Sequence, residues 1–144
     1  MEIQNYSETS RLQIDSTAFE LLREITKWAK FLAIAGYIGL AFLLLLGLIS
    51  GFVIAGSVEF QAGIFVIIFY SLFVAVYIFP VYYLHQFSKN MNLALVRNDS
   101  DKLTEALLYL KSHYKFLGIL TMILLTMYLL VMVSTVVSGV LTNF

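Results

Sequence analysis

Three long runs without a charged residue constrain this chain more than any other feature of its sequence. They cover residues 31–55, 62–84 and 116–141, and none contains Asp, Glu, Lys or Arg. A helix needs about 20 apolar residues to cross the hydrocarbon of a bilayer, so each run is long enough to span it. Only 12% of the chain is charged, which is about half the share in an average soluble domain and argues against a soluble core.

The three runs predict helices rather than strands. They do not alternate between apolar and polar residues, as the strands of a membrane barrel do. Backbone groups in hydrocarbon must be hydrogen-bonded within their own segment, which favours helices. The predicted fold class is an all-α integral membrane protein with three transmembrane helices. Residues 1–14 are predicted to form a flexible N-terminal tail and residues 15–144 a single helical membrane domain.

The basic residues predict which ends of the spans share a side. All Lys and Arg precede the first run or lie between the second and third: Arg11, Arg23, Lys27, Lys30, Lys89, Arg97, Lys102, Lys111 and Lys115. The segment between the first two runs has one charge, Glu59. Cytoplasmic segments carry the excess of Lys and Arg. We therefore expect the N-terminus in the cytoplasm and the C-terminus on the opposite side.

The end of the second run, with the sequence PVYYLHQFSKN from Pro80, is interpreted as the place where a helix leaves the membrane. Tyr82 and Tyr83 are the amphipathic aromatic residues that favour this boundary, and His85 follows just beyond it. Pro80 has no N–H to donate and crowds the preceding turn, which predicts a kink. This stretch, together with His113, is therefore a candidate interface or kink.

The basic segments are predicted to be helical as well. Residues 16–30 have one apolar and one charged face, which is typical of an amphipathic helix. Apolar stripes on both sides of the turn-forming residues 97–101 predict a cytoplasmic helical hairpin over residues 85–115. Two placements of the N-terminal helix remain open, namely packing against this hairpin or lying flat on the inner leaflet.

No group of residues predicts catalysis, a metal or a cofactor. His85 and His113 are the chain's histidines, one on each arm of the predicted hairpin, where they could approach each other. Asp99, Asp101 and Glu105 are the nearest further ligands, but they form no recognised ligand spacing. The spans contain no ionisable Asp, Glu, Lys, Arg or His, which argues against a carboxylate proton relay or a voltage sensor.

Gly47, Gly51 and Ala55 recur every four residues in the first run. Small residues let helices approach closely, so this stripe is a candidate packing site. Packing within the chain, self-association and no special role remain as interpretations.

The second half of the chain, over residues 80–123, resembles a family of small uncharacterised integral membrane proteins of the Bacteroidota. The residues that carry the resemblance are Pro80, Tyr82, Tyr83, Phe87, Ser88, Lys89, Leu110, Lys111, Tyr114, Lys115 and Phe116. The resemblance implies a bacterial inner membrane. Together with the distribution of Lys and Arg, this predicts a periplasmic C-terminus. It implies no activity and no catalytic residues.

Three functions are compatible with these patterns. The first is a non-enzymatic scaffold or accessory subunit that acts through helix packing and its cytoplasmic hairpin. The second is an oligomeric pore, to which a hydroxyl stripe in the third run would contribute: Thr121, Ser134, Thr135 and Ser138. The third is a lipid-acting enzyme that uses the histidines or tyrosines at the interface. The expected partners are the lipid bilayer and a second copy or another membrane protein, without nucleic acid.

Overall fold

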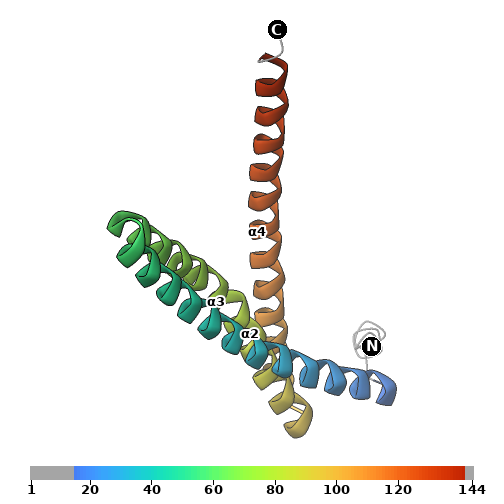
Figure 1. The fold of residues 1–144 in the computed structure, drawn as a ribbon. Helices are drawn as coiled ribbons and strands as arrows, with labels where there is room; N and C mark the ends of the chain where they lie inside the picture. Colours follow the sequence, from blue (N-terminus) through green and yellow to red (C-terminus); the bar gives the residue numbers. More distant parts are fainter. Residues whose placement is uncertain (1–14, 142–144) are drawn as a thin grey trace, which may run out of the picture.

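The structure, a computed structural model, describes residues 15–141 as long helices joined by short connections. Helix α2 runs over Ser16–Ser57, α3 over Phe60–Arg97 and α4 over Ser100–Leu141 (Figure 1). Each contains a stretch that is long and apolar enough to cross a membrane. The prediction of a helical chain with three long apolar helices is confirmed. The predicted flexible tail lies outside the described residues.

Helix α2 joins the first basic segment to the first apolar run without a break. Its N-cap is Asp15, whose carboxylate accepts a hydrogen bond from the backbone N–H of Ser16 at 2.7 Å. A capping carboxylate satisfies a donor that the first turn leaves unpaired. No proline follows in α2, so the basic segment and the apolar run form one continuous helix.

The chain reverses direction between α3 and α4 within two residues. Asn98 closes α3 in the left-handed conformation, with φ of 49°, which Asn adopts more readily than most residues. The carboxylate of Asp99 then accepts hydrogen bonds from the backbone N–H groups of Asp101 (2.9 Å) and Lys102 (3.1 Å). These residues turn the chain and cap the new helix, so the two helices meet at their basic ends.

Helices α2 and α3 pack side by side along their apolar lengths (Figure 1). Gly47, Gly51 and Gly63 are buried where they meet. A Cβ atom added to Gly51 would lie 2.9 Å from the carbonyl oxygen of Gly63, and one added to Gly63 would lie 2.6 Å from the backbone nitrogen of Ala55. The backbones are in contact here because glycine has no side chain.

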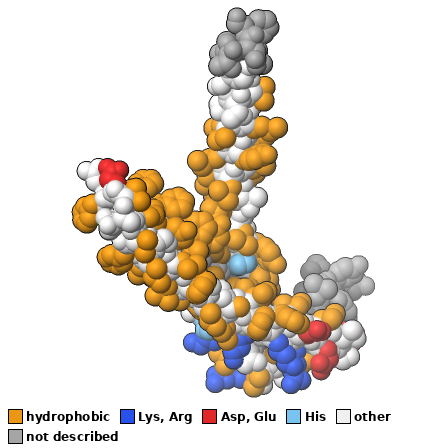
Figure 2. All heavy atoms as spheres, in the orientation of Figure 1, with side chains coloured by type: hydrophobic (Ala, Val, Ile, Leu, Met, Phe, Trp, Pro, Cys, Tyr) orange, Lys and Arg blue, Asp and Glu red, His pale blue; other side chains and the backbone are white. Residues whose placement is uncertain are grey.

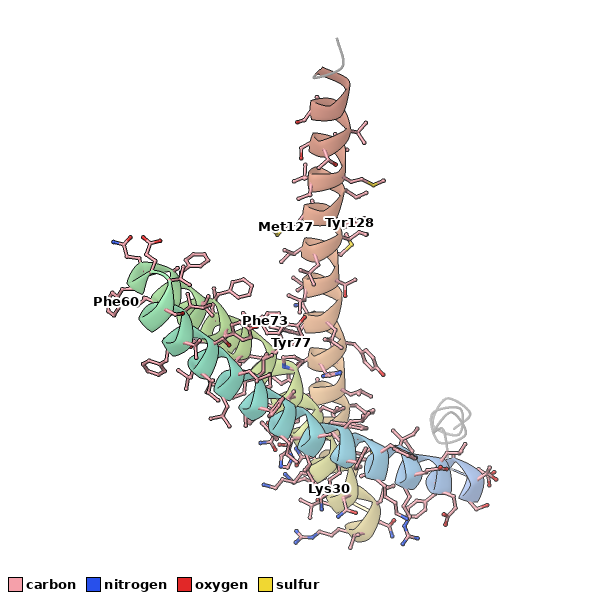
Figure 3. All side chains as sticks on the ribbon, in the orientation of Figure 1. Lys30, Phe60, Phe73, Tyr77, Met127 and Tyr128 are labelled. Atoms are coloured by element: carbon pink, nitrogen blue, oxygen red, sulfur yellow. The ribbon has the colours of Figure 1, made fainter. Side chains whose placement is uncertain are left out.

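Helix α4 contacts α3 near the connecting turn and then diverges from the other two helices (Figure 1). Every side chain over residues 121–139 is exposed. Met127 and Tyr128 project from this part of α4, clear of α2 and α3, and are 60% and 64% exposed (Figure 3). The apolar part of α4 is therefore an isolated helix, whereas α2 and α3 are a packed pair.

Candidate functional site at the basic end of the helices

The three helices meet in one small core at their basic ends. Its buried residues are Ala29 of α2, Phe87 and Met91 of α3, and Ala106 of α4, which we call the helix junction. Phe87 is 1% exposed, and Met91 and Ala106 are 0% exposed. Two large side chains of the central helix thus fill the space left by an alanine on each neighbour. Partly buried side chains surround them: Leu22, Leu84, Leu95, Leu103, Tyr109 and Leu110.

A buried hydrogen bond connects α2 to α3 beside this core. The hydroxyl of Ser88, which is 2% exposed, donates to the backbone carbonyl of Thr26 at 2.9 Å. The hydroxyl of Thr26 donates to the carbonyl of Leu22, 2.7 Å away. A buried hydroxyl without such a partner would be costly, so this bond fixes how the two helices face each other.

A second polar contact connects α4 to α3 at the proline. Nδ1 of His113 lies 2.8 Å from the carbonyl oxygen of Pro80, which is itself buried. A carbonyl oxygen can only accept, so this hydrogen bond assigns the proton to Nδ1 and leaves Nε2 as the acceptor of the neutral ring. Helix α3 continues through Pro80 from Phe60 to Arg97. The kink remains a prediction.

His85 lies in a different environment from His113. Its ring meets the ring of Tyr37 on α2 edge-on, with 5.9 Å between centroids. Within residues 15–141, its Nδ1 is the buried side-chain nitrogen or oxygen that has no hydrogen-bond partner. The two histidines thus contact different helices. Over the described residues, no three His, Cys, Asp or Glu side chains lie close enough to hold a metal ion.

A cleft with basic walls opens between α2 and α3 next to His85. Its volume is about 470 Å³. We call it the basic cleft, and its lining residues are Arg23, Thr26, Lys27, Lys30, His85, Ser88, Lys89, Asn92 and Leu93. Lys and Arg side chains gather at this end of the molecule in Figure 2, and Lys30 lies where α2 crosses α3 in Figure 3. The arrangement can attract an anion, because all four of its charged residues are cationic.

The other predicted site residues lie along the apolar runs of α2 and α3. Tyr82 and Tyr83 have their ring centroids 6.0 Å apart, and the hydroxyl of Tyr82 accepts a hydrogen bond from the amide of Gln86 at 3.1 Å. The small-residue stripe of α2 faces α3, as described above, and lies away from the basic cleft. Neither group adds a reactive side chain to the cleft.

Sequence reasoning missed the basic cleft and the role of Gly63. The cleft had a signal in the sequence, since Arg23, Lys27 and Lys30 recur at spacings of four and three and so share one helix face. The matching face of α3 could not be found in this way, because it combines His85, Ser88 and Lys89 with residues of no common type. Gly63 is the single glycine of residues 62–84, so it forms no stripe of small residues. The position of α2 against it shows why a side chain would not fit there.

Comparison of the chain with protein-family models, with curated protein sequences and with solved structures finds no match.

Proposed function

We propose that this chain is a non-enzymatic scaffold or accessory subunit of a bacterial inner membrane, whose third helix packs against a transmembrane helix of another subunit. The observation that carries this proposal is the isolation of α4, all of whose side chains over residues 121–139 are exposed. A chain that worked alone as a three-helix bundle would bury one face of each span along its length. Over residues 15–139, α2 and α3 do so and α4 does not.

The surface of α4 supports close approach by another helix. Ser134 and Ser138 are four residues apart, and so are Thr135 and Gly139, and all four are exposed. Small residues at this spacing favour helix association in lipid, where the hydrophobic effect between helices is absent and packing decides. The hydroxyls of Thr126, Ser134 and Thr135 donate to carbonyl oxygens of their own helix. They therefore need no water-filled pore, and no observation favours the pore.

Replacing Tyr128 by a photo-crosslinking phenylalanine analogue is expected to capture a membrane protein when living cells are irradiated. The analogue at Phe42 of α2 is the matched control, because the two side chains are 64% and 62% exposed. Mass spectrometry of the products identifies the partner, including a second copy of this chain. Equal capture at both positions, or capture of lipid alone at position 128, would contradict the proposal.

The proposal includes a cytoplasmic basic end and a periplasmic C-terminus, and the α3–α4 hairpin is then the part that faces the cytoplasm. The chain has no native cysteine, so single cysteines can report this topology. We expect Val58→Cys to react with a membrane-impermeant maleimide in bacterial spheroplasts and Ser100→Cys to react only after lysis. Val58 is 79% exposed, and Ser100 is also exposed. The reverse labelling pattern would show that the basic end faces the periplasm, and it would contradict the proposed topology.

A further inference from the structure

The basic cleft brings four cationic side chains together at one site. Arg23, Lys27 and Lys30 enter it from α2, and Lys89 enters it from α3. No Asp or Glu lines the cleft, and over residues 15–141 the ion pair that forms is between Lys102 and Glu105 of α4. Four cations at one site repel each other until an anion joins them. Phosphate suits such a site, since Arg binds it through two parallel hydrogen bonds and Lys binds it as a point charge.

The cleft lies at the level where lipid headgroups are found. Lys30 is the last residue before the uncharged run that begins at Phe31, and Lys89 follows Leu84, the end of the second run, by little more than one turn. Long basic side chains at span ends direct their charges toward the interface while their methylene groups stay against apolar surface. A phosphate held here is therefore at the depth of a phospholipid headgroup.

An apolar groove extends the same face toward the spans. It has a volume of about 340 Å³ and is lined by Tyr37, Ile78, Phe79, Tyr82 and Tyr83. Tyr37 lies two turns beyond Lys30 on the same face of α2. The groove and the cleft adjoin where the ring of Tyr37 meets the ring of His85. An occupant with an anionic head and an apolar tail would fill both, whereas a free phosphate would use only the cleft.

We propose that the basic cleft binds the phosphate of an anionic phospholipid, one of whose acyl chains lies in the adjoining apolar groove. This site is formed by α2 and α3 within one chain. It is therefore independent of any partner of α4 and goes beyond the scaffold function.

The test measures lipid binding to the purified full-length chain in a neutral detergent. Native mass spectrometry gives the apparent Kd for phosphatidylglycerol, for phosphatidylcholine with the same acyl chains, and for glycerol 3-phosphate, which has the phosphate without the tails. We expect tightest binding of phosphatidylglycerol. The double variant Lys30→Gln/Lys89→Gln is expected to weaken it about 25-fold, since each lysine near an anionic headgroup contributes about fivefold.

The matched control is Lys111→Gln/Lys115→Gln, which removes the same charge from exposed positions of α4 that do not line the cleft. It is expected to leave the Kd for phosphatidylglycerol within about twofold of the unchanged chain, because charges outside the site act only through screened, long-range attraction. If both double variants weaken phosphatidylglycerol binding equally, the lipid responds to the overall surface charge and not to the cleft, and the proposal is overturned. Equal affinity for phosphatidylcholine would also overturn it, and so would binding of glycerol 3-phosphate as tight as that of the lipid.

Discussion

Phe87→Ala is expected to lower the free energy of unfolding by about 3–5 kcal/mol, the usual cost of removing a fully buried aromatic ring. Phe87 is 1% exposed and contributes to the helix junction, where residues from all three helices pack together. It follows the second uncharged run, and on the predicted topology its ring is withdrawn from water rather than from lipid. Burial there gains the full hydrophobic effect, which is absent between helices inside the hydrocarbon.

The measurement is equilibrium unfolding in mixed micelles of increasing denaturing-detergent content, followed by circular dichroism. Phe65→Ala on the same helix is the matched control, because Phe65 is 71% exposed within the apolar run. We expect its substitution to change the free energy of unfolding by less than about 0.5 kcal/mol, as at other surface sites. Similar losses for both variants would show that the helix junction does not hold the three helices together.

Gly63→Ala is expected to cost about 2 kcal/mol of stability, within the range for overpacking a tight contact. The added Cβ would lie 2.6 Å from the backbone nitrogen of Ala55 and 2.5 Å from its Cβ, and it would also overlap the carbonyl oxygen of Gly51. Backbone atoms cannot rotate away as a flexible side chain can, so α2 and α3 must separate. The same unfolding measurement applies.

Gly39→Ala is the control for this substitution, since a Cβ added to Gly39 has no atom within 4 Å. Alanine is the better helix former by about 1 kcal/mol, so this variant should be as stable as the unchanged chain or more stable. A second comparison uses Gly63→Ala combined with Ala55→Gly, which removes one of the opposing carbon atoms. The double variant should recover part of the stability that Gly63→Ala loses. If it recovers none, and if Gly39→Ala is also destabilised, the result would argue against backbone contact at Gly63.

The fold class could be predicted from the sequence, because it depends on the distribution of charged residues along the chain. The absence of charge over residues 31–55, 62–84 and 116–141 is enough to predict three apolar helices, because unpaired charges and unpaired backbone groups are both costly in hydrocarbon. The candidate site was much harder to predict. The positions of the two histidines on the predicted hairpin allowed them to approach each other, but their partners could not be read from the sequence: His113 contacts Pro80 on α3 and His85 contacts Tyr37 on α2.

The sequence by itself determined where the chain is apolar, that it turns within residues 97–101, and that its basic residues gather at one end of the helices. These properties follow from local chemistry, namely the transfer of side chains into lipid and the conformations that turn residues adopt. Only the tertiary structure decided that α2 pairs with α3 through Gly51 and Gly63, that α4 diverges from the pair, and that the basic cleft opens between α2 and α3. The physical reason is that a span is apolar on every face, so hydrophobicity does not distinguish the side that meets another helix from the side that meets lipid, and close packing decides.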